Sequence, residues 1–324
     1  MTVASLTILL ALLAGSAAEG HGHSRRITLL TPSWTAGEIS MDARLLVLVN
    51  VVSSEMLEEV WLEVRTAGGG WERRADASRL PLSPLEIVAG VAIEPRRIPG
   101  IEAGGQFEVR IRSTYRNGEA DSSPSLEIRV AEAERREEDL LNRLSECHRG
   151  LDVLLEDIEE DYRRLCRLER RPVGGEAEDR SAPAELAAME ERWNERTRAM
   201  LHASKELGSI LDDAVTDRFV DSAREAQYRR IPARLRAWGL EKGMGTSVRR
   251  NLARVRRAVG RDERREAFHA SLDAQDQFIE ALKRTVAELK AWRGNVDLRR
   301  NVRLLLQTQK GVNGELERAR DRNK

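Results

Sequence analysis

The spacing of apolar residues changes once along this chain, near residue 131, and no other feature constrains the fold as strongly. Between residues 25 and 131 apolar and polar residues alternate, clearly so in 60–64, 107–112 and 126–130. A period of two is typical of strands with one face on a core and the other in water. From residue 132 the spacing lengthens to three and four, which is typical of helices that bury one stripe. The sequence therefore predicts a strand domain at 25–131 and a long-helix domain at 132–324.

The strand domain holds about seven short strands in roughly 100 residues, a pattern typical of immunoglobulin-like and fibronectin type III-like sandwiches. The continuous apolar run 45–52 predicts a central strand, and Gly68-Gly69-Gly70 and Asn117-Gly118 predict hairpin turns. The Cys-Trp-Cys pattern of antibody domains is absent from the sequence, which favours the fibronectin-like variant.

Two helical stretches carry strict 4-3 spacing with charged flanks, which is typical of coiled coils. The first run is Phe268, Leu272, Gln275, Ile279, Leu282, Val286 and Leu289. The second is Leu298, Val302, Leu305, Gln309, Val312, Leu316 and Ala319. Each run contains one glutamine, and a polar residue at such a position costs stability but specifies register. We expect both runs to pair within one chain, giving a monomer, with pairing between chains in a homodimer as the alternative.

Breaks between helices are predicted at Pro172–Pro183, at Pro232, at Gly239–Gly245 and at Gly294-Asn295. They divide the domain into four or five long helices, arranged as antiparallel pairs or as an elongated, coiled-coil-like bundle.

Residues 1–18 predict a signal peptide. Leu6–Ala14 is a short apolar run and Ser16-Ala17-Ala18 offers small residues for cleavage. The run is too short to span a bilayer comfortably, and the sequence contains no second apolar segment of this kind. We therefore expect a periplasmic or secreted chain with no transmembrane segment after the signal peptide.

Charge is balanced overall, with 54 basic and 54 acidic residues, which argues against a nucleic-acid partner. Locally it is uneven. Residues 132–161 hold twelve acidic and four basic residues, a net of −8, and residues 223–265 hold fourteen basic and four acidic, a net of +10. We expect these blocks to face each other or to be simply solvated. The alternative is that the basic block is a surface for an acidic polymer or a membrane.

Catalytic patterns are missing from the sequence. The five histidines show no metalloprotease spacing, no GxSxG occurs, and the loop 239–247 lacks the Gly-Lys-Ser/Thr ending of a P-loop. We expect no enzymatic activity, no catalytic residues and no cofactor. Cys147 and Cys166 lie nineteen residues apart on one predicted helix, too far to bridge each other. Cys147 is expected to be a small buried hydrophobe, with a disulfide across a parallel dimer as the alternative.

Cleavage after Ala18 would place Glu19-Gly20-His21 at the mature N-terminus, followed by His23. A free amine, two backbone amides and a third-position imidazole suit square-planar Cu(II) or Ni(II). His21 and His23 are therefore candidate metal ligands, and the alternative is a flexible tail.

Three stretches resemble a family of large envelope proteins of planctomycete-type bacteria, which have a signal peptide, a fibronectin/Ig-like domain and a long Arg/Glu-rich helical region. Ile101–Val130 is similar to their last sandwich strands, Thr216–Ala237 to a mid-helical segment and Ala291–Ala319 to a tryptophan-marked terminal helix. The family has no established activity, so the resemblance implies an architecture and no functional residues.

These observations predict a non-enzymatic structural or interaction protein of the bacterial envelope. The sandwich would dock a protein partner through loops or an edge strand, and the helices would act as a spacer or oligomerisation arm. One alternative is an extracytoplasmic Cu/Ni-handling module. Another is a carbohydrate-binding accessory protein, which an exposed row of Trp34, Trp61 and Trp71 would favour.

Overall fold

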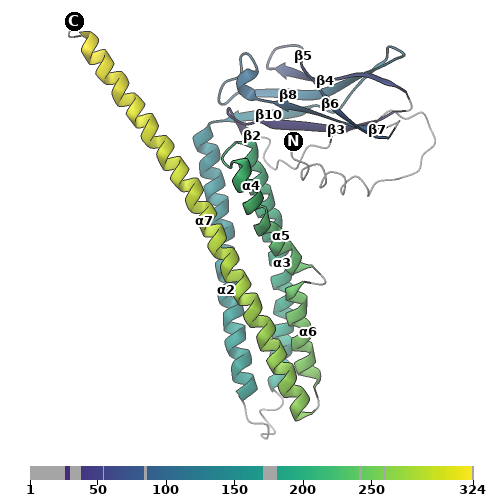
Figure 1. The fold of residues 1–324 in the computed structure, drawn as a ribbon, viewed down its shortest axis with the longest axis vertical. Coiled ribbons are helices and arrows are strands. Elements are labelled where there is room, and N and C mark those ends of the chain that lie inside the picture. Colours follow the sequence, from purple (N-terminus) through teal and green to yellow (C-terminus); the bar gives the residue numbers. More distant parts are fainter. Residues whose placement is uncertain are drawn as a thin grey trace. The chain divides into compact units, whose positions relative to one another are not determined.

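A computed structural model describes residues 26–29, 38–53, 55–83, 86–170, 181–240, 243–258 and 260–322 of the 324-residue chain. The predicted change of structure is present, since two β-sheets precede a region of long helices (Figure 1). The chain divides into two compact units. The first comprises Met1–Thr31, Leu46–Ala92 and Glu108–Leu126, and the second comprises Pro32–Leu45, Ile93–Phe107 and Glu127–Lys324.

The described strands form a four-stranded sheet in the order β1-β3-β7-β6 and a six-stranded sheet in the order β2-β10-β8-β4-β5, with β9 paired to β8. Strand β1 pairs antiparallel with β3, β4 with β5, β6 with β7 and β8 with β9, whereas β2 and β10 pair in parallel. The strands are β1 (Arg26–Leu29), β2 (Glu38–Ser40), β3 (Leu45–Val52), β4 (Leu57–Thr66), β5 (Glu72–Asp76), β6 (Ser78–Ser83), β7 (Glu86–Ile93), β8 (Gln106–Tyr115), β9 (Ala120–Ser122) and β10 (Leu126–Ala131).

Both predicted hairpin turns are confirmed. Gly68 (φ 78°) lies between β4 and β5, and Gly118 (φ 84°) lies between β8 and β9. Positive φ is accessible to glycine without the steric cost that a Cβ imposes.

Strand β4 departs from the predicted alternation. Its residues from Val60 to Val64 are all buried, so Trp61 and Glu63 do not face water as the period of two implies. Strand β8 does alternate, with Phe107, Val109 and Ile111 buried between half-buried neighbours. The extra burial on β4 has a specific cause, a layer of arginines, which is described with the candidate site.

The helical region contains three long helices and three shorter ones in the described residues. Helix α7 runs without interruption through Gly294-Asn295, so the predicted break there is wrong. A glycine inside a helix costs about 1 kcal/mol relative to alanine, and burial of the adjacent Trp292 and Val296 outweighs that cost. The helices are α2 (Ala133–Arg170), α3 (Ser181–Thr216), α4 (Ser222–Tyr228), α5 (Arg230–Gly239), α6 (Met244–Arg257) and α7 (Arg261–Arg322), with a short 3-10 helix, η1 (Pro95–Arg97), before them.

Two further predicted breaks lie at helix starts. Pro232 lies in the first turn of α5. Backbone N–H groups in a first turn have no partner within the helix, so a proline there costs no helical hydrogen bond. Gly243 and Gly245 flank the start of α6. A Cβ at Gly243 would lie 2.2 Å from the Ala237 carbonyl oxygen, and one at Gly245 would lie 2.8 Å from the Thr197 side chain. These glycines therefore allow close packing of α6 against α5 and α3.

Helices of the second unit pack side by side around one apolar core (Figure 1). Helix α2 contacts α3 and α7, while α6 contacts the same two helices and α3 also contacts α5. Every residue of the first 4-3 run on α7, from Phe268 to Leu289, is buried in this core. Within the described residues, the helices include none with the length and apolar content that a membrane crossing requires.

Candidate interaction surface

Helix α7 runs antiparallel to α2, and their polar contacts fix the register between them. Lys283 pairs with Glu159 at 2.9 Å, Arg303 with Glu137 at 3.1 Å, and the Gln307 amide donates to Glu134 at 2.8 Å. Because α2 begins at residue 133, α7 passes the end of α2 shortly after Gln307. The remaining residues of α7 extend past the helix that covers its earlier turns.

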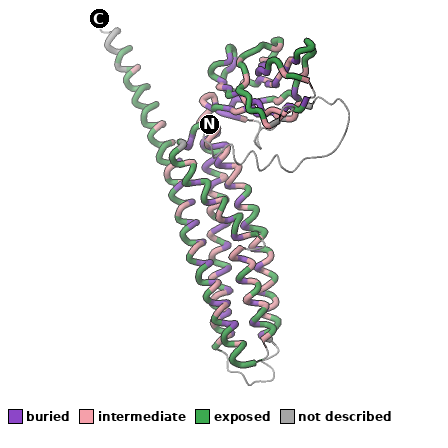
Figure 2. Tube along the Cα trace, turned by 45° about the vertical axis from the view of Figure 1, so that its right-hand side comes forward, coloured by how far each residue is buried: buried purple, intermediate pink, exposed green. Residues whose placement is uncertain are grey.

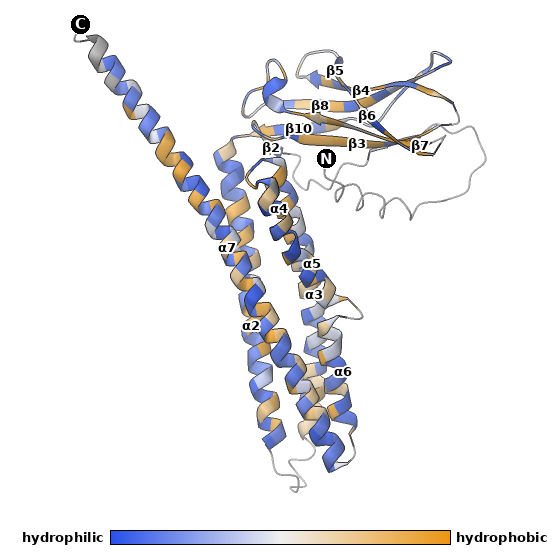
Figure 3. Ribbon diagram, viewed as in Figure 1, coloured by the Kyte–Doolittle hydropathy of each residue, from blue (hydrophilic) through white to orange (hydrophobic). Residues whose placement is uncertain are grey.

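Residues 298–322 of α7, here called the distal segment, expose large apolar side chains. Leu298 is 63% exposed and Leu305 is 70% exposed, whereas Val296 just before them is buried. Figure 2 shows this end of α7 as largely exposed, and Figure 3 shows apolar residues along it. The expectation that both 4-3 runs pair within the chain is therefore wrong for the second run. Its exposed apolar residues, with two neighbours outside the strict spacing, are Leu298, Val302, Leu304, Leu305, Leu306 and Val312.

The exposed apolar stripe is not a continuation of the line along which α7 contacts its own chain. That line runs from Leu289 through Trp292 and Val296 and then becomes polar. Its polar members are Arg299, which donates to the Phe219 carbonyl oxygen at 2.8 Å, followed by Arg303 and Gln307. Each residue turns the helix by about 100°, so these three are centred about 130° around α7 from Leu298, Val302 and Leu305. The apolar stripe therefore faces away from the chain's own contacts.

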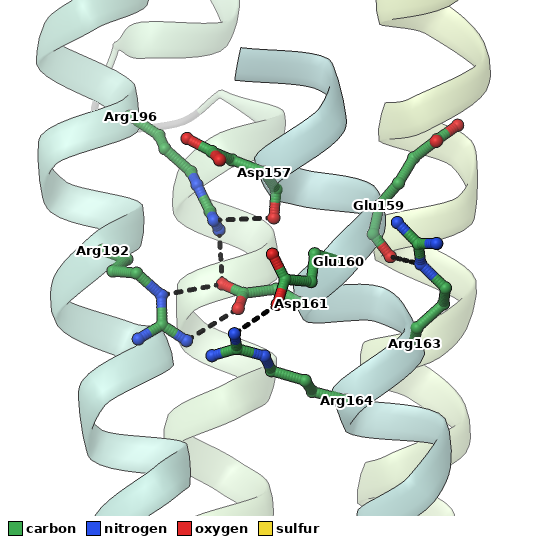
Figure 4. A network of polar contacts seen from close by, with 8 residues as sticks. All are labelled: Asp157, Glu159, Glu160, Asp161, Arg163, Arg164, Arg192 and Arg196. Atoms are coloured by element: carbon green, nitrogen blue, oxygen red, sulfur yellow. Dashed lines mark hydrogen bonds and ion pairs between the residues drawn. The ribbon is translucent and has the colours of Figure 1, made fainter. Parts of the chain in front are cut away.

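A buried ion cluster joins α2 to α3 and holds together these two helices, against which α7 packs (Figure 4). The Asp161 carboxylate is 2% exposed and accepts from Arg192 at 2.7 and 3.1 Å and from Arg196 at 2.7 Å. Arg196 also donates to the Asp157 carbonyl oxygen at 3.0 Å. Since both carboxylate oxygens are occupied by guanidinium donors, this cluster holds two helices together.

This cluster is not among the features predicted from the sequence, although the apolar spacing carries a signal for it. Continuing the apolar spacing of α2 beyond Ile158 by three residues reaches Asp161, and continuing that of α3 beyond Trp193 by three reaches Arg196. A charge at a core-facing position predicts an interior partner, since an unpaired buried charge is costly. Both residues are buried, and they pair with each other.

A second buried network ties the end of α3 to α2 and to β2 within the same unit. Asp217 accepts from the Ser40 backbone N–H at 2.7 Å and from Arg136 at 3.0 Å. Nearby, Arg143 donates to Asp213 at 2.6 Å. Burial raises the pKa of Asp217, against the opposing effect of Arg136. This network positions the strand beside the helix end.

We expect the two oppositely charged blocks to face each other or to be solvated, but the ion pairs described next join residues of these blocks to other helices. Acidic residues of α2 pair with α3 and α7, as Asp161 does with Arg192 and Glu159 does with Lys283. Basic residues of α5 and α6 pair with other helices too: Arg234 with Glu288 on α7, and Arg256 with Glu190 on α3 at 3.1 Å. The reason lies in the packing, since α2 and α6 are both neighbours of α3 and α7 and take their partners from those helices.

Tryptophans on the six-stranded sheet are covered by arginines. Arg73 lies 4.6 Å from the ring centroid of Trp61, while Arg65 and Arg110 lie 4.7 and 4.0 Å from that of Trp71. Cation–π contacts of this kind stabilise by about 0.5–1 kcal/mol when exposed. Trp61 is only 8% exposed and Trp71 is half-buried, so neither presents the open aromatic face that sugar stacking requires. Trp34 lies outside the described residues.

Glu63 is the carboxylate at the centre of this layer. It accepts from the Trp61 indole N–H at 3.2 Å and from Arg110 at 2.7 Å. Burial acts to raise its pKa, but the hydrogen bonds from Arg110 and Trp61 outweigh burial and leave the pKa below its ordinary value. Glu63 is thus held in its charged form, and the arginines that contact Trp61 and Glu63 cover this face of β4.

Candidate metal ligands His21 and His23 lie outside the described residues, and the part of the chain that the structure describes contains no cluster of three or more His, Cys, Asp or Glu suited to a metal ion. Cys147 and Cys166 are free thiols, both half-buried on α2 against the apolar core. Burial raises the pKa of Cys147 to about 11. The thiol thus stays protonated at neutral pH, as expected of a small hydrophobe.

No family model and no curated protein matches this chain. Among solved structures it is similar to astrotactin-2, described as a conserved vertebrate-specific and perforin-like membrane protein involved in neuronal development, with 14% sequence identity and a TM-score of 0.23. The match covers 63% of this chain and 38% of that chain. A likeness at this score carries no weight for fold or function.

Proposed function

We propose that this chain is a non-enzymatic structural or interaction protein of the bacterial envelope, and that the distal segment of α7 is its docking surface. The observation that carries the proposal is the exposed apolar stripe of Leu298, Val302, Leu305 and Val312. Contiguous apolar surface is rarely left open to water in a protein that acts alone. A rigid helix with an apolar stripe is a common way to recognise a second helix.

Several features of the helical region support a role as a spacer. The interior carboxylate of Asp161 is held by two arginines, which occupy both of its oxygens. The 4-3 spacing along α7 supports a coiled-coil-like arrangement, and the two sheets support an immunoglobulin- or fibronectin-like sandwich.

Docking through β5 or β6, two of the edge strands, is less well supported than docking through α7. Edge strand β5 carries Glu72, Arg73, Arg74 and Asp76, and edge strand β6 contains Pro81. Charges and proline on edge strands hinder the addition of a further strand. The partner class we favour is therefore a helix.

Site-specific photocross-linking in living cells tests the proposal. A photoreactive residue at Leu305, which is on the stripe, should give a discrete cross-linked product, whether to another protein or to a second copy. The same residue at Lys310, which is off the stripe, should give little. Equal labelling at both positions, or none at either, would remove the distal segment as a docking surface.

Export to the envelope is a separate part of the proposal and needs its own measurement. Mass spectrometry of the native protein should find Glu19 as the first residue, because cleavage is expected after Ala18. A full-length chain recovered from the cytosol would contradict the envelope location without bearing on the helix surface.

A further inference from the structure

We infer that the partner of the distal segment is a second copy of this chain, joined through residues 298–322 in a parallel, in-register, two-stranded coiled coil. This inference rests on the proposed function of that surface and names its occupant. A twofold pairing uses the same patch on both copies, so it needs no other protein to cover the exposed residues.

Heptad spacing supplies the first argument. In the sequence Leu298, Leu305 and Val312 take d positions and Val302 takes an a position, with Leu316 and Ala319 continuing the repeat. A β-branched residue at a with leucine at d favours two parallel strands. Leu298, Val302, Leu305 and Val312 are thus exposed side chains that a second identical helix would cover.

The position of Gln309 supplies the second argument. It is an a residue in the middle of the apolar stripe, and it is exposed. In a parallel pair in register, the amide of one copy meets the amide of the other, and an amide can both donate and accept a hydrogen bond. A single polar a residue specifies register and a two-stranded state at some cost in stability. A partner of unrelated sequence would leave this amide without that match.

Charges next to the stripe supply the third argument. Glu315 takes a g position, and the sequence places Arg320 at the e position five residues later. In a parallel pair these two positions meet across the interface twice, with opposite charges. An antiparallel pair centred on Gln309 would instead bring Arg299 of one copy opposite Arg320 of the other. Parallel orientation is therefore the one that the charges favour.

The polar side of the helix supplies the last argument. Arg299, Arg303 and Gln307 already contact Phe219, Glu137 and Glu134 of their own chain. Those contacts fix the rotation of α7 and leave the apolar stripe pointing away from them. The stripe is therefore presented in one orientation before any partner arrives, which lowers the entropic cost of pairing.

Sedimentation velocity of the purified full chain over a range of concentrations tests the inference. We expect a reversible monomer–dimer equilibrium. Leu305→Glu should weaken dimerisation on the order of 100-fold, because a leucine of each copy leaves the interface and two like charges face each other. Leu304→Glu is the matched control: it is the adjacent exposed leucine, at an outward c position, and should leave the equilibrium nearly unchanged. Both residues are exposed, so neither variant should unfold the monomer.

Orientation is tested with Val302→Cys and a short bismaleimide cross-linker. Parallel pairing in register places the two introduced thiols together and should give a covalent dimer, whereas the unsubstituted chain should give little. Antiparallel pairing centred on Gln309 would separate them by about 20 Å along the helix, and absence of the cross-link in a dimeric sample would overturn the parallel arrangement.

Two outcomes would overturn the second copy as occupant. One is a chain that stays monomeric at all concentrations while Leu305 cross-links to another protein in cells, which retains the proposed docking function. The other is binding to anionic vesicles that Leu304→Glu and Leu305→Glu reduce equally, which would assign the segment to a membrane surface. A monomer with no position-specific cross-link at Leu305 would contradict the docking function as well.

Discussion

Helix α7 carries the same 4-3 spacing twice, and the two stretches have opposite fates. From Phe268 to Leu289 the spaced residues are buried in the core formed with α2, α3 and α6. From Leu298 to Val312 the apolar members of the second run are exposed. Each stretch includes one glutamine: Gln275, the third member of its run, is 0% exposed, and Gln309, the fourth member of its run, is exposed.

The difference teaches that a heptad pattern specifies a helix with an apolar stripe but not the helix that covers it. What separates the two stretches is the extent of α2, whose first turn lies beside Arg303 and Gln307. The two stretches also differ in the direction that their apolar stripe faces. Up to Val296 the stripe faces the chain's own helices, and from Leu298 onward it faces away from them. The same 4-3 spacing of apolar residues thus forms part of a core in one stretch of α7 and an exposed surface in the other.

Disrupting the buried ion cluster between α2 and α3, against which the first stretch of α7 packs, should have the largest effect on the free energy of unfolding. Asp161→Ala leaves the buried Arg196 without its carboxylate, and loss of one member of a buried ion pair costs about 3–5 kcal/mol. Urea unfolding should show this loss in the free energy of unfolding. Glu160→Ala on the same turn is the control, because its pair with Arg164 is about half exposed and should contribute less than about 1 kcal/mol. Equal costs for the two variants would contradict the interior role of Asp161.

Truncating one leucine in each half compares them directly. Leu282→Ala, in the buried run, should lower the free energy of unfolding by about 2–5 kcal/mol, since it leaves a cavity in a packed core. Leu305→Ala should change the stability of the monomer by less than about 0.5 kcal/mol, because the side chain is already in water. The measurement is urea unfolding at a concentration where the chain is monomeric. A large loss from Leu305→Ala would mean that the distal segment is covered within the chain.

Apolar spacing was sufficient to predict where strands give way to helices, because burial on one face imposes a period that the sequence records. The hairpins at Gly68 and Gly118 were predicted for a similarly local reason, the need for positive φ. The uninterrupted course of α7 through Gly294 was not predicted. Burial of neighbouring apolar residues there outweighs the low helix propensity of glycine, which costs about 1 kcal/mol.

The candidate surface shows the same limit. Its residues were visible as a second heptad run, but their exposure depends on where α2 begins relative to α7, which no local pattern records. The cluster at Asp161 depends on which helix stands opposite. The arginine layer over Trp61 and Trp71 depends on pairing between β4, β5 and β8, which brings together residues far apart in the sequence.

The two glutamines give a smaller and sharper comparison. Both amide atoms of Gln275 are buried without a hydrogen-bond partner, and a buried unsatisfied polar group costs about 1–3 kcal/mol. Gln275→Leu should therefore raise the free energy of unfolding by that order, because an apolar side chain of similar size replaces the amide. Gln309→Leu should leave monomer stability unchanged, and thermal unfolding of the two variants in parallel checks both. A less stable Gln275→Leu variant would show that the amide has an interior partner.

The smallest effect is expected at the boundary between the two halves, where Arg303 reaches Glu137. Burial raises the pKa of Glu137, against the opposing effect of Arg303, Arg299 and Arg300. A carboxyl whose pKa is raised by folding binds protons more tightly in the folded state, so its contribution to stability is present at low pH and is lost as pH rises through the raised pKa. Glu137→Gln should therefore remove part of the rise in unfolding free energy that accompanies a fall in pH from 7 to 5. Asp212 and Asp217, whose pKa values burial also raises, contribute with the same sign in both proteins, so the difference between the two pH profiles isolates Glu137. Parallel profiles would mean that Glu137 is solvated in the folded chain and that α7 separates from α2 before Arg303.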